Sequence, residues 1–263
     1  MKTLRERFVI GAILMLITLG VILSRSNELL FAFVLLLSSL EILELFSCLD
    51  PDNKGRNRLI TVIGNAFFQL FAYLRMPELL VAGSVAFFMY LFVLSVVHPY
   101  REFEDLFLTL FVVIYISFFS AFALLFPANM PYGLLLVICV SWGTDTMAYF
   151  SGFCFGKTPL TSISPKKTRE GAVGGLLGAV ALALLFRPLF FTTLSIQQLV
   201  FITAVGSLSA QLGDLFASRL KRKMNIKDFG TLLKAHGGIM DRFDSVQFAL
   251  PTVWLMMRFV TRF

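Results

Sequence analysis

Uninterrupted hydrophobic runs, separated by short polar stretches, dominate the pattern of this chain. The runs at 8–23 and 106–126 are long enough to cross the hydrocarbon core of a bilayer, which is roughly 30 Å thick. A membrane β-barrel would instead show apolar and polar residues in alternation. The pattern therefore predicts an all-α, polytopic membrane protein.

The same pattern predicts about nine transmembrane helices. The third is the weakest of them, because Asn65 and Gln69 interrupt its apolar run. The first follows a basic N-terminus, as in a signal peptide, but it is as long as a full span and no small-residue cleavage site follows it. We therefore interpret it as the first transmembrane helix. The expected spans are 8–24, 29–48, 58–75, 79–97, 105–126, 131–153, 172–192, 197–217 and 243–261.

The spans group into two parts. We predict an N-terminal membrane region at 1–126 with about five spans. A C-terminal catalytic region at 127–263 then holds about four spans and the two longest polar loops, 154–171 and 218–242. No internal repeat is evident, so the sequence does not indicate an inverted-repeat transporter.

Charge gives the chain an orientation in the membrane. Of its 263 residues, 57% are hydrophobic and 15% are charged, and the formal net charge is +7. If the chain crosses the membrane nine times, most of the 23 lysines and arginines lie on the same side as the N-terminus, above all in the loops 154–171 and 218–242. The positive-inside rule makes that side cytoplasmic and predicts a multi-pass protein of the cell (inner) membrane. Basic loops and anionic headgroups account for the charge, so no nucleic-acid partner is expected.

The first stretch with candidate chemistry runs from the sixth expected span toward the seventh. Asp145 lies within the span, and Ser164, Lys166, Lys167 and Thr168 follow in the loop. An acid at a helix centre costs about 2.5–3.5 kcal/mol on insertion scales, and hydroxyl and ammonium groups together suit phosphate oxygens. The alternative is a basic anchor loop followed by a glycine face for helix contact. That alternative leaves Asp145 and the dense hydroxyl groups unexplained.

The second stretch, 211–245, brings carboxylates close to many cations. Asp214 lies in an expected span, and Asp241 and Asp244 share one face if a helix begins near them. Paired carboxylates suit a hard divalent cation such as Mg²⁺ that holds a polyphosphate. The alternative is a helix whose first turn carries a capping aspartate and a charge-paired arginine. That alternative explains Asp241 or Asp244 alone, but not both together with Asp214.

Groups suited to phosphate oxygens surround these acids. Paired glycines let backbone N–H groups approach an anion, and a helix that starts just after them adds its dipole. At a membrane surface, such acids and cations indicate a phosphoryl- or nucleotidyl-transfer site for a lipid headgroup. The candidates in this stretch are Arg219, Lys221, Arg222, Lys227, His236, Gly237, Gly238 and Arg242.

Two further acids and three cysteines receive no catalytic role. Glu41 and Glu44 share a helical face, and we expect them to make structural pairs rather than to serve a polar cavity. The cysteines Cys48, Cys139 and Cys154 are far apart and lack metal-ligand spacing, so we expect small buried hydrophobes.

The stretch SRLKRKMNIKDFGTLLKAHGGIMDRFDS (218–245) closely resembles the signature of the CDP-diacylglycerol synthases, or phosphatidate cytidylyltransferases. The upstream stretch from Asp145 to Gly175, with its FGK, SPKKT and EG-x-x-GG patterns, is also typical of that family. The N-terminal spans match only in hydropathy. Lys234 and Ala235 stand where many members have proline and glycine, which alters the stiffness of the loop and leaves every polar signature position in place.

The resemblance implies the reaction of CTP with phosphatidate to give CDP-diacylglycerol and pyrophosphate, in a bilayer and with Mg²⁺. It implies Asp214 and Asp241 as metal ligands, Asp244 and Asp145 as neighbouring carboxylates, and a second cation on the same acids. Dimers are common among such enzymes, so a homodimer is expected. The implied catalytic residues are Asp214, Asp241, Lys167, Arg219 and His236. The implied substrate and phosphate contacts are Ser164, Lys166, Lys167, Thr168, Arg219, Lys221, Arg222, Lys227, His236, Gly237, Gly238 and Arg242.

Two other functions fit parts of the pattern. A transporter or channel for a phosphorylated solute would use intramembrane acids and cationic mouths, but cations would then be needed on both faces. A CTP-dependent lipid kinase, or a synthase for an ether-lipid analogue, would share the membrane architecture and the cytidine nucleotide. The match to the diacyl-lipid signature favours the cytidylyltransferase.

Overall fold

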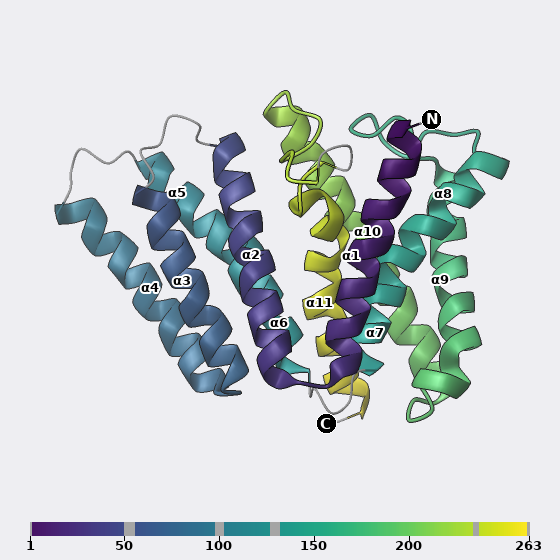
Figure 1. The fold of residues 1–263 in the computed structure, drawn as a ribbon, viewed down its shortest axis with the longest axis horizontal. Helices are drawn as coiled ribbons and strands as arrows, with labels where there is room; N and C mark the ends of the chain where they lie inside the picture. Colours follow the sequence, from purple (N-terminus) through teal and green to yellow (C-terminus); the bar gives the residue numbers. More distant parts are fainter. Residues whose placement is uncertain (1, 50–55, 98–102, 127–131, 234–236, 262–263) are drawn as a thin grey trace. The chain divides into compact units, whose positions relative to one another are not determined.

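The structure is a computed structural model that describes residues 2–49, 56–97, 103–126, 132–233 and 237–261 (Figure 1). Regular structure within these residues is helical, and the only β-type pairing there is an isolated bridge between Pro159 and Thr168. The prediction of an all-α chain is therefore confirmed for the described part of the protein.

Each expected span contains a helix, although several helices extend beyond it. Two of the helical stretches contain a π-helical segment, η1 between α5 and α6 and η2 between α7 and α8. The elements are α1 (Lys2–Ser24), α2 (Asn27–Leu49), α3 (Arg56–Tyr73), α4 (Pro77–Val97), α5 (Phe103–Val112), η1 (Val113–Phe118), α6 (Phe119–Leu125), α7 (Tyr132–Ile138), η2 (Cys139–Gly143), α8 (Thr144–Phe155), α9 (Arg169–Phe190), α10 (Ile196–Lys223) and α11 (Met240–Thr261).

Six helical stretches in the described residues are long and apolar enough to cross a membrane, as a multi-pass membrane protein requires. The apolar part of α1 is shorter, at Val9–Ser24, and α3 and α11 carry polar or charged residues within their length. The count of about nine spans therefore stays a prediction. The six are Asn27–Leu49, Glu78–Val97, Glu104–Leu125, Tyr132–Phe155, Arg169–Phe190 and Ile196–Lys223.

Contacts divide the chain into two compact units. The first comprises Met1–Asn129 and Asp228–Met240, and the second comprises Met130–Lys227 and Asp241–Phe263. The segment before α11 thus belongs by its contacts to the N-terminal helices. The sequence-based boundary between 126 and 127 rested on where the catalytic groups lie, which a division by contacts does not test.

In the first unit, α3 lies between α2 and α4 (Figure 1). The polar residues that weakened its hydropathy are fully buried. The Asn65 Nδ2 atom donates to Ser38 Oγ at 2.9 Å, and Gln69 Nε2 donates to Ser120 Oγ at 2.8 Å and to the carbonyl of Ser117 at 3.1 Å. These bonds satisfy the donor nitrogens of the two buried amides, as buried polar groups require, whereas the Gln69 Oε1 atom has no hydrogen-bond partner among the described residues.

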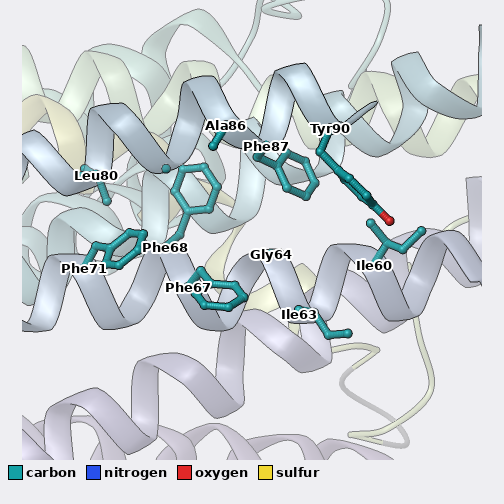
Figure 2. A pocket seen from close by; sticks show the side chains of 11 residues that line it. Ile60, Ile63, Gly64, Phe67, Phe68, Phe71, Leu80, Ala86, Phe87 and Tyr90 are labelled. Carbon is teal, nitrogen blue, oxygen red and sulfur yellow. The ribbon is translucent and has the colours of Figure 1, made fainter. Parts of the chain in front are cut away.

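A groove of about 360 Å³ between α3 and α4 is lined almost entirely by apolar side chains (Figure 2). The rings of Phe68 and Phe87 meet edge to face there, with centroids 6.4 Å apart. A Cβ at Gly64 would lie 2.8 Å from the Phe87 ring, and one at Gly83 would lie 2.7 Å from the Phe71 ring. Small residues therefore let each helix seat the aromatic side chains of the other.

In the second unit, α8 and α9 approach closely along a face of glycines. A Cβ at Gly171 would lie 2.9 Å from the carbonyl oxygen of Ala148, and one at Gly175 would lie 2.9 Å from that of Thr144. The EG-x-x-GG pattern therefore serves helix contact, as small residues do in membrane helices. This contact fixes the two helices that flank the loop 156–168.

The second polar loop is shorter than the sequence predicted. Residues 218–242 were expected to form one loop, but α10 continues to Lys223 and α11 begins at Met240. Lys221, Arg222 and Lys223 form the last turn of α10, where cations favour the negative end of the helix dipole. Polarity ended the predicted span at 217, whereas the helix continues beyond its apolar part.

Candidate active site

A cavity of about 510 Å³ opens in the second unit between α8, α9, α10 and the loop that joins α8 to α9. Its lining includes the charged residues Asp145, Lys166, Lys167 and Asp214. The Lys167 ammonium group and the Asp214 carboxylate form an ion pair, and both side chains are partly exposed. The cavity thus gathers an acid from each of two predicted spans and the lysines of the intervening loop.

Apolar residues also line the cavity. They include Leu160, Leu215 and the aromatic residues Tyr149 and Phe153. The Phe153 side chain is 81% exposed and Tyr149 is 70% exposed, although both belong to a helix long and apolar enough to span a membrane. The cavity therefore combines charged groups with exposed apolar surface.

The loop 156–168 is held by its own polar residues. Glu170 accepts hydrogen bonds from the backbone N–H groups of Lys157 and Thr158, at 3.1 and 3.3 Å, and from the Thr158 hydroxyl. The Thr168 Oγ1 atom accepts from the N–H of Gly171 at 3.1 Å and so caps α9. Thr168, which we predicted as a phosphate contact, lines the cavity but already serves as this cap.

A second ion pair joins α10 to α11. The Lys221 Nζ atom lies 2.8 Å from Asp241 Oδ1 and 3.9 Å from Asp244 Oδ2. Both acids therefore face the same cation, as their spacing on one helical face predicted. A Cβ at Gly213 would lie 2.8 Å from the carbonyl oxygen of Asp244, so this glycine lets α11 approach α10 beside Asp214.

The four predicted metal-binding acids are electrostatically connected. Asp145 Oδ2 accepts a hydrogen bond from Ser245 Oγ at 3.0 Å. The charges of Asp145, Asp214 and Lys221 all act on Asp244. The acids therefore form one cluster on α8, α10 and α11.

The donor set of this cluster suits Mg²⁺, which prefers carboxylate oxygens and water. In the conformation described, however, no three or more His, Cys, Asp or Glu residues among the described ones are arranged to hold a metal ion. The Lys167 and Lys221 ammonium groups contact the acids instead. The cluster thus fits the cation by chemistry and charge, and the lysines partly neutralise it here.

Helix geometry sorts the predicted cations of α10. Asp214, Ser218 and Lys221 are spaced i, i+4 and i+7 and so share one face. Arg219 falls off that face, whereas Arg222, at i+8 from Asp214, lies at its edge, and both arginines are exposed. Treating 218–242 as a loop could not separate these cations, whereas a continuous helix does.

The remaining predicted residues have varied surroundings. Lys227 is exposed, whereas Ser164 lines the cavity. The carbonyl of Arg242 accepts a hydrogen bond from Trp142 Nε1 at 3.2 Å. The guanidinium charge of the same residue acts on Asp145. His236 lies outside the described residues.

One of the paired glycines, Gly238, lies against an acid of the same unit. Gly237 has a φ of 81°, in the region that favours glycine. A Cβ at Gly238 would lie 2.6 Å from Cδ of Glu44, whose carboxylate accepts from the N–H groups of Ile239 and Met240. Glu44 is the residue that sequence reasoning missed. Its signal was an acid within an apolar run, but its backbone partners lie almost two hundred positions away.

Known proteins resemble the chain mainly over one part of their length. The phosphatidate cytidylyltransferase of Thermotoga maritima is 36% identical over 155 residues, which cover 56% of this chain and 57% of the relative. The Bacillus subtilis protein of that name is 42% identical over 130 residues, or 48% of each chain. Phosphatidate cytidylyltransferase 4, chloroplastic, of Arabidopsis thaliana is 44% identical over 105 residues, covering 40% of this chain and 27% of the relative.

The chain thus matches about half the length of these bacterial relatives. The sequence profile of the cytidylyltransferase family, in contrast, matches residues 5–260. That match includes both the N-terminal helices and the acid cluster on α8, α10 and α11. Because it extends over nearly all of the sequence, this chain belongs to the cytidylyltransferase family.

Proposed function

We propose that the protein transfers CMP from CTP to phosphatidate, giving CDP-diacylglycerol and pyrophosphate. The observation that carries the proposal is the lining of the cavity, which brings the charged side chains of Asp145, Lys167 and Asp214 together with the aromatic side chains of Tyr149 and Phe153. A phosphorylated lipid likewise combines an anionic headgroup with a hydrocarbon part. The names of the relatives and the family match support the same reaction.

The lipid phosphate lies against the lysines in this proposal. Lys166 and Lys167 enter the cavity from the loop that Glu170 and the Thr168 cap hold in place. Ammonium groups on a fixed loop provide charge-assisted contacts to phosphate oxygens. The exposed faces of Tyr149 and Phe153 provide the apolar surface on which the acyl chains begin.

The chemical step needs little proton transfer. A phosphate oxygen of phosphatidate attacks the α-phosphorus of CTP, the new P–O bond forms, and the bond to the β-phosphate breaks to release pyrophosphate. Because the attacking oxygen is already anionic, no strong general base is required. Catalysis is then mainly positioning and neutralisation of charge by Lys166, Lys167 and Lys221.

The acids define where Mg²⁺ binds in this proposal. Asp214 and Asp241 would be its ligands, with Asp145 and Asp244 as neighbouring carboxylates, and a second cation would share the same acids. When bound, the metal supplies positive charge to the triphosphate. The acid cluster supports this assignment because it brings carboxylates of α8, α10 and α11 together around the same lysines.

The location of the site follows from the membrane topology. We place the protein in the cell (inner) membrane, with the N-terminus and the loops 156–168 and 224–239 on the cytoplasmic side, where CTP is found. Their lysines and arginines support this orientation. A homodimer is the proposed assembly.

Product analysis tests the reaction directly. Purified protein in liposomes is incubated with each of the four nucleoside triphosphates, with and without phosphatidate and Mg²⁺. We expect CDP-diacylglycerol and pyrophosphate only with CTP, phosphatidate and Mg²⁺ together. Solute flux without a product lipid would establish the transporter instead, and phosphorylation of an added lipid alcohol would establish the lipid kinase.

A further inference from the structure

The segment before α11 is fastened to the end of α2 in the first unit. Oε1 of Glu44 accepts a hydrogen bond from the N–H of Ile239 at 3.1 Å, and Oε2 accepts from the N–H of Met240 at 3.0 Å. One turn further along α2, Cys48 Sγ contacts the carbonyl oxygen of Phe229 at 2.9 Å. Two side chains of α2 therefore hold two ends of the segment 229–240.

The Glu44 carboxylate provides what the first turn of a helix needs, hydrogen-bond acceptors and a negative charge. The first N–H groups of a helix have no partner within the helix, and they lie at the positive end of its dipole. A carboxylate offers two acceptor oxygens and a negative charge, so it satisfies both needs at once. Glu44 thus caps α11 from a distant part of the chain, in place of a capping residue in the local sequence.

The segment is shaped around this carboxylate. A Cβ at Gly230 would lie 2.6 Å from Cδ of Glu44, and a Cβ at Gly238 would lie at the same distance. Any larger residue at either position would displace the carboxylate from its N–H partners. Gly238 belongs to the HGG part of the signature, which we had predicted to approach a phosphate. Its close neighbour in the structure is an acid of the protein itself.

From these contacts we infer that Glu44 is a positioning residue for the acids of α11. Asp241 follows Met240 directly, and Asp244 lies one turn further along the same helix. The hydrogen bonds at 239 and 240 fix where that helix begins, and so fix the direction in which both acids point. This inference rests on the proposed cytidylyltransfer, because it gives the two acids their catalytic use.

A different role for the same N–H groups predicts the opposite effect. If the backbone at 238–240 is a phosphate site that Glu44 blocks, removal of the carboxylate should tighten the binding of CTP. If Glu44 positions the helix, its removal should impair turnover and Mg²⁺ use while the KM for CTP changes little. The two roles are therefore separated by the KM for CTP.

The test compares Glu44→Ala and Glu44→Gln with the matched control Glu28→Ala in the full-length protein. Glu28 is an exposed acid on the same helix, bonded to Ser26 within its own turn. Amide hydrogen exchange is measured across peptide 237–245 without substrate, and kcat, the KM for CTP and the Mg²⁺ concentration for half-maximal rate are measured with substrate. Thermal unfolding establishes that each variant is folded.

For Glu44→Ala we expect exchange across 237–245 to be roughly tenfold faster or more, because a charge-assisted pair of hydrogen bonds is lost. We expect kcat to fall about tenfold and the Mg²⁺ requirement to rise, with less than about a threefold change in the KM for CTP. Glu44→Gln keeps one acceptor oxygen and should lie between Glu44→Ala and wild type. Glu28→Ala should match wild type in every measurement.

Three results would overturn the inference. Unchanged exchange at 237–245 in Glu44→Ala would show that the carboxylate does not hold the segment. Faster exchange with wild-type kcat and Mg²⁺ dependence would show that the segment does not position the acids. A lower KM for CTP would show that Glu44 blocks a phosphate site. Failure of the proposed function would appear differently, as a wild-type protein that makes no CDP-diacylglycerol while the exchange difference persists.

Discussion

Lys221 Nζ, on the last turns of α10, lies 2.8 Å from Oδ1 of Asp241, at the start of α11. The Asp241 side chain is only 2% exposed and that of Lys221 is 13% exposed, so solvent screens the pair weakly. Asp244 approaches the same ammonium group at 3.9 Å. Lys221 therefore lies between two buried acids of α11 and interacts with both.

Replacing Lys221 by methionine should destabilise the protein in a way that Mg²⁺ partly reverses. The substitution keeps the apolar stem and leaves two buried carboxylates without their ammonium partner, a loss of about 3–5 kcal/mol for a buried pair. A divalent cation can neutralise the same oxygens, and binding to the folded state raises stability. Thermal unfolding with Mg²⁺ and with a chelator measures both effects.

The matched control is Lys223→Met, which changes an exposed lysine two positions along the same helix. It should alter the unfolding temperature little, because exposed charges contribute little to stability. An equal loss in both variants, or an equal gain from Mg²⁺ in both, would contradict the role of Lys221.

The Asp241→Asn variant should fold and insert but lose turnover by about 100-fold or more, because the amide removes an anionic ligand for the metal. The measurement is CDP-diacylglycerol formation by the purified variant across a range of Mg²⁺ concentrations. Asp105→Asn, at the start of α5 in the first unit, is the control and should retain activity. Near-normal turnover in Asp241→Asn would show that this carboxylate does not hold the metal.

The Lys166→Ala variant should raise the KM for CTP or for phosphatidate, and the effect should shrink as salt is added. Lys166 lines the cavity at the surface of the second unit, where ionic strength screens its charge. The KM values are measured between low and physiological salt, with the exposed Lys223→Ala as control. A change in KM that is the same at every salt concentration would argue against a phosphate contact.

The fold was predictable to the extent that the bilayer dictates it. Solid apolar runs must be helical in hydrocarbon, so the helices were located from hydropathy alone. The interruptions were not predictable in this way. The Gln69 side chain on α3 bonds to the carbonyl of Ser117 in η1, and that pairing depends on contact between helices far apart in sequence.

In the candidate site, too, the residues could be identified from the local sequence, whereas their contacts with distant segments could not. Asp145, Lys167 and Asp214 were identified from residue type and spacing, and the structure brings them to one cavity. The orientation of Lys221 relative to Arg219 required knowing that α10 continues to Lys223. For Glu44 the sequence indicated a structural pairing but not the partners, because these belong to a segment whose sequence does not identify α2 as its neighbour.

A side chain at Gly175 should weaken the contact between α8 and α9. A Cβ there would lie 2.9 Å from both the Ala148 Cβ and the carbonyl oxygen of Thr144, so the helices must separate to admit it. We expect Gly175→Ala to cost about 1–3 kcal/mol of stability, as overpacking does, and to lower turnover because α8 carries Asp145. Thermal unfolding and CDP-diacylglycerol formation measure the two effects.

Gly20→Ala is the control, because nothing lies within 4 Å of a Cβ at that position. Since alanine favours a helix by about 0.8–1 kcal/mol over glycine, the control should unfold at the same or a higher temperature. A similar rise of the unfolding temperature in both variants would show that the glycine face does not hold α8 against α9.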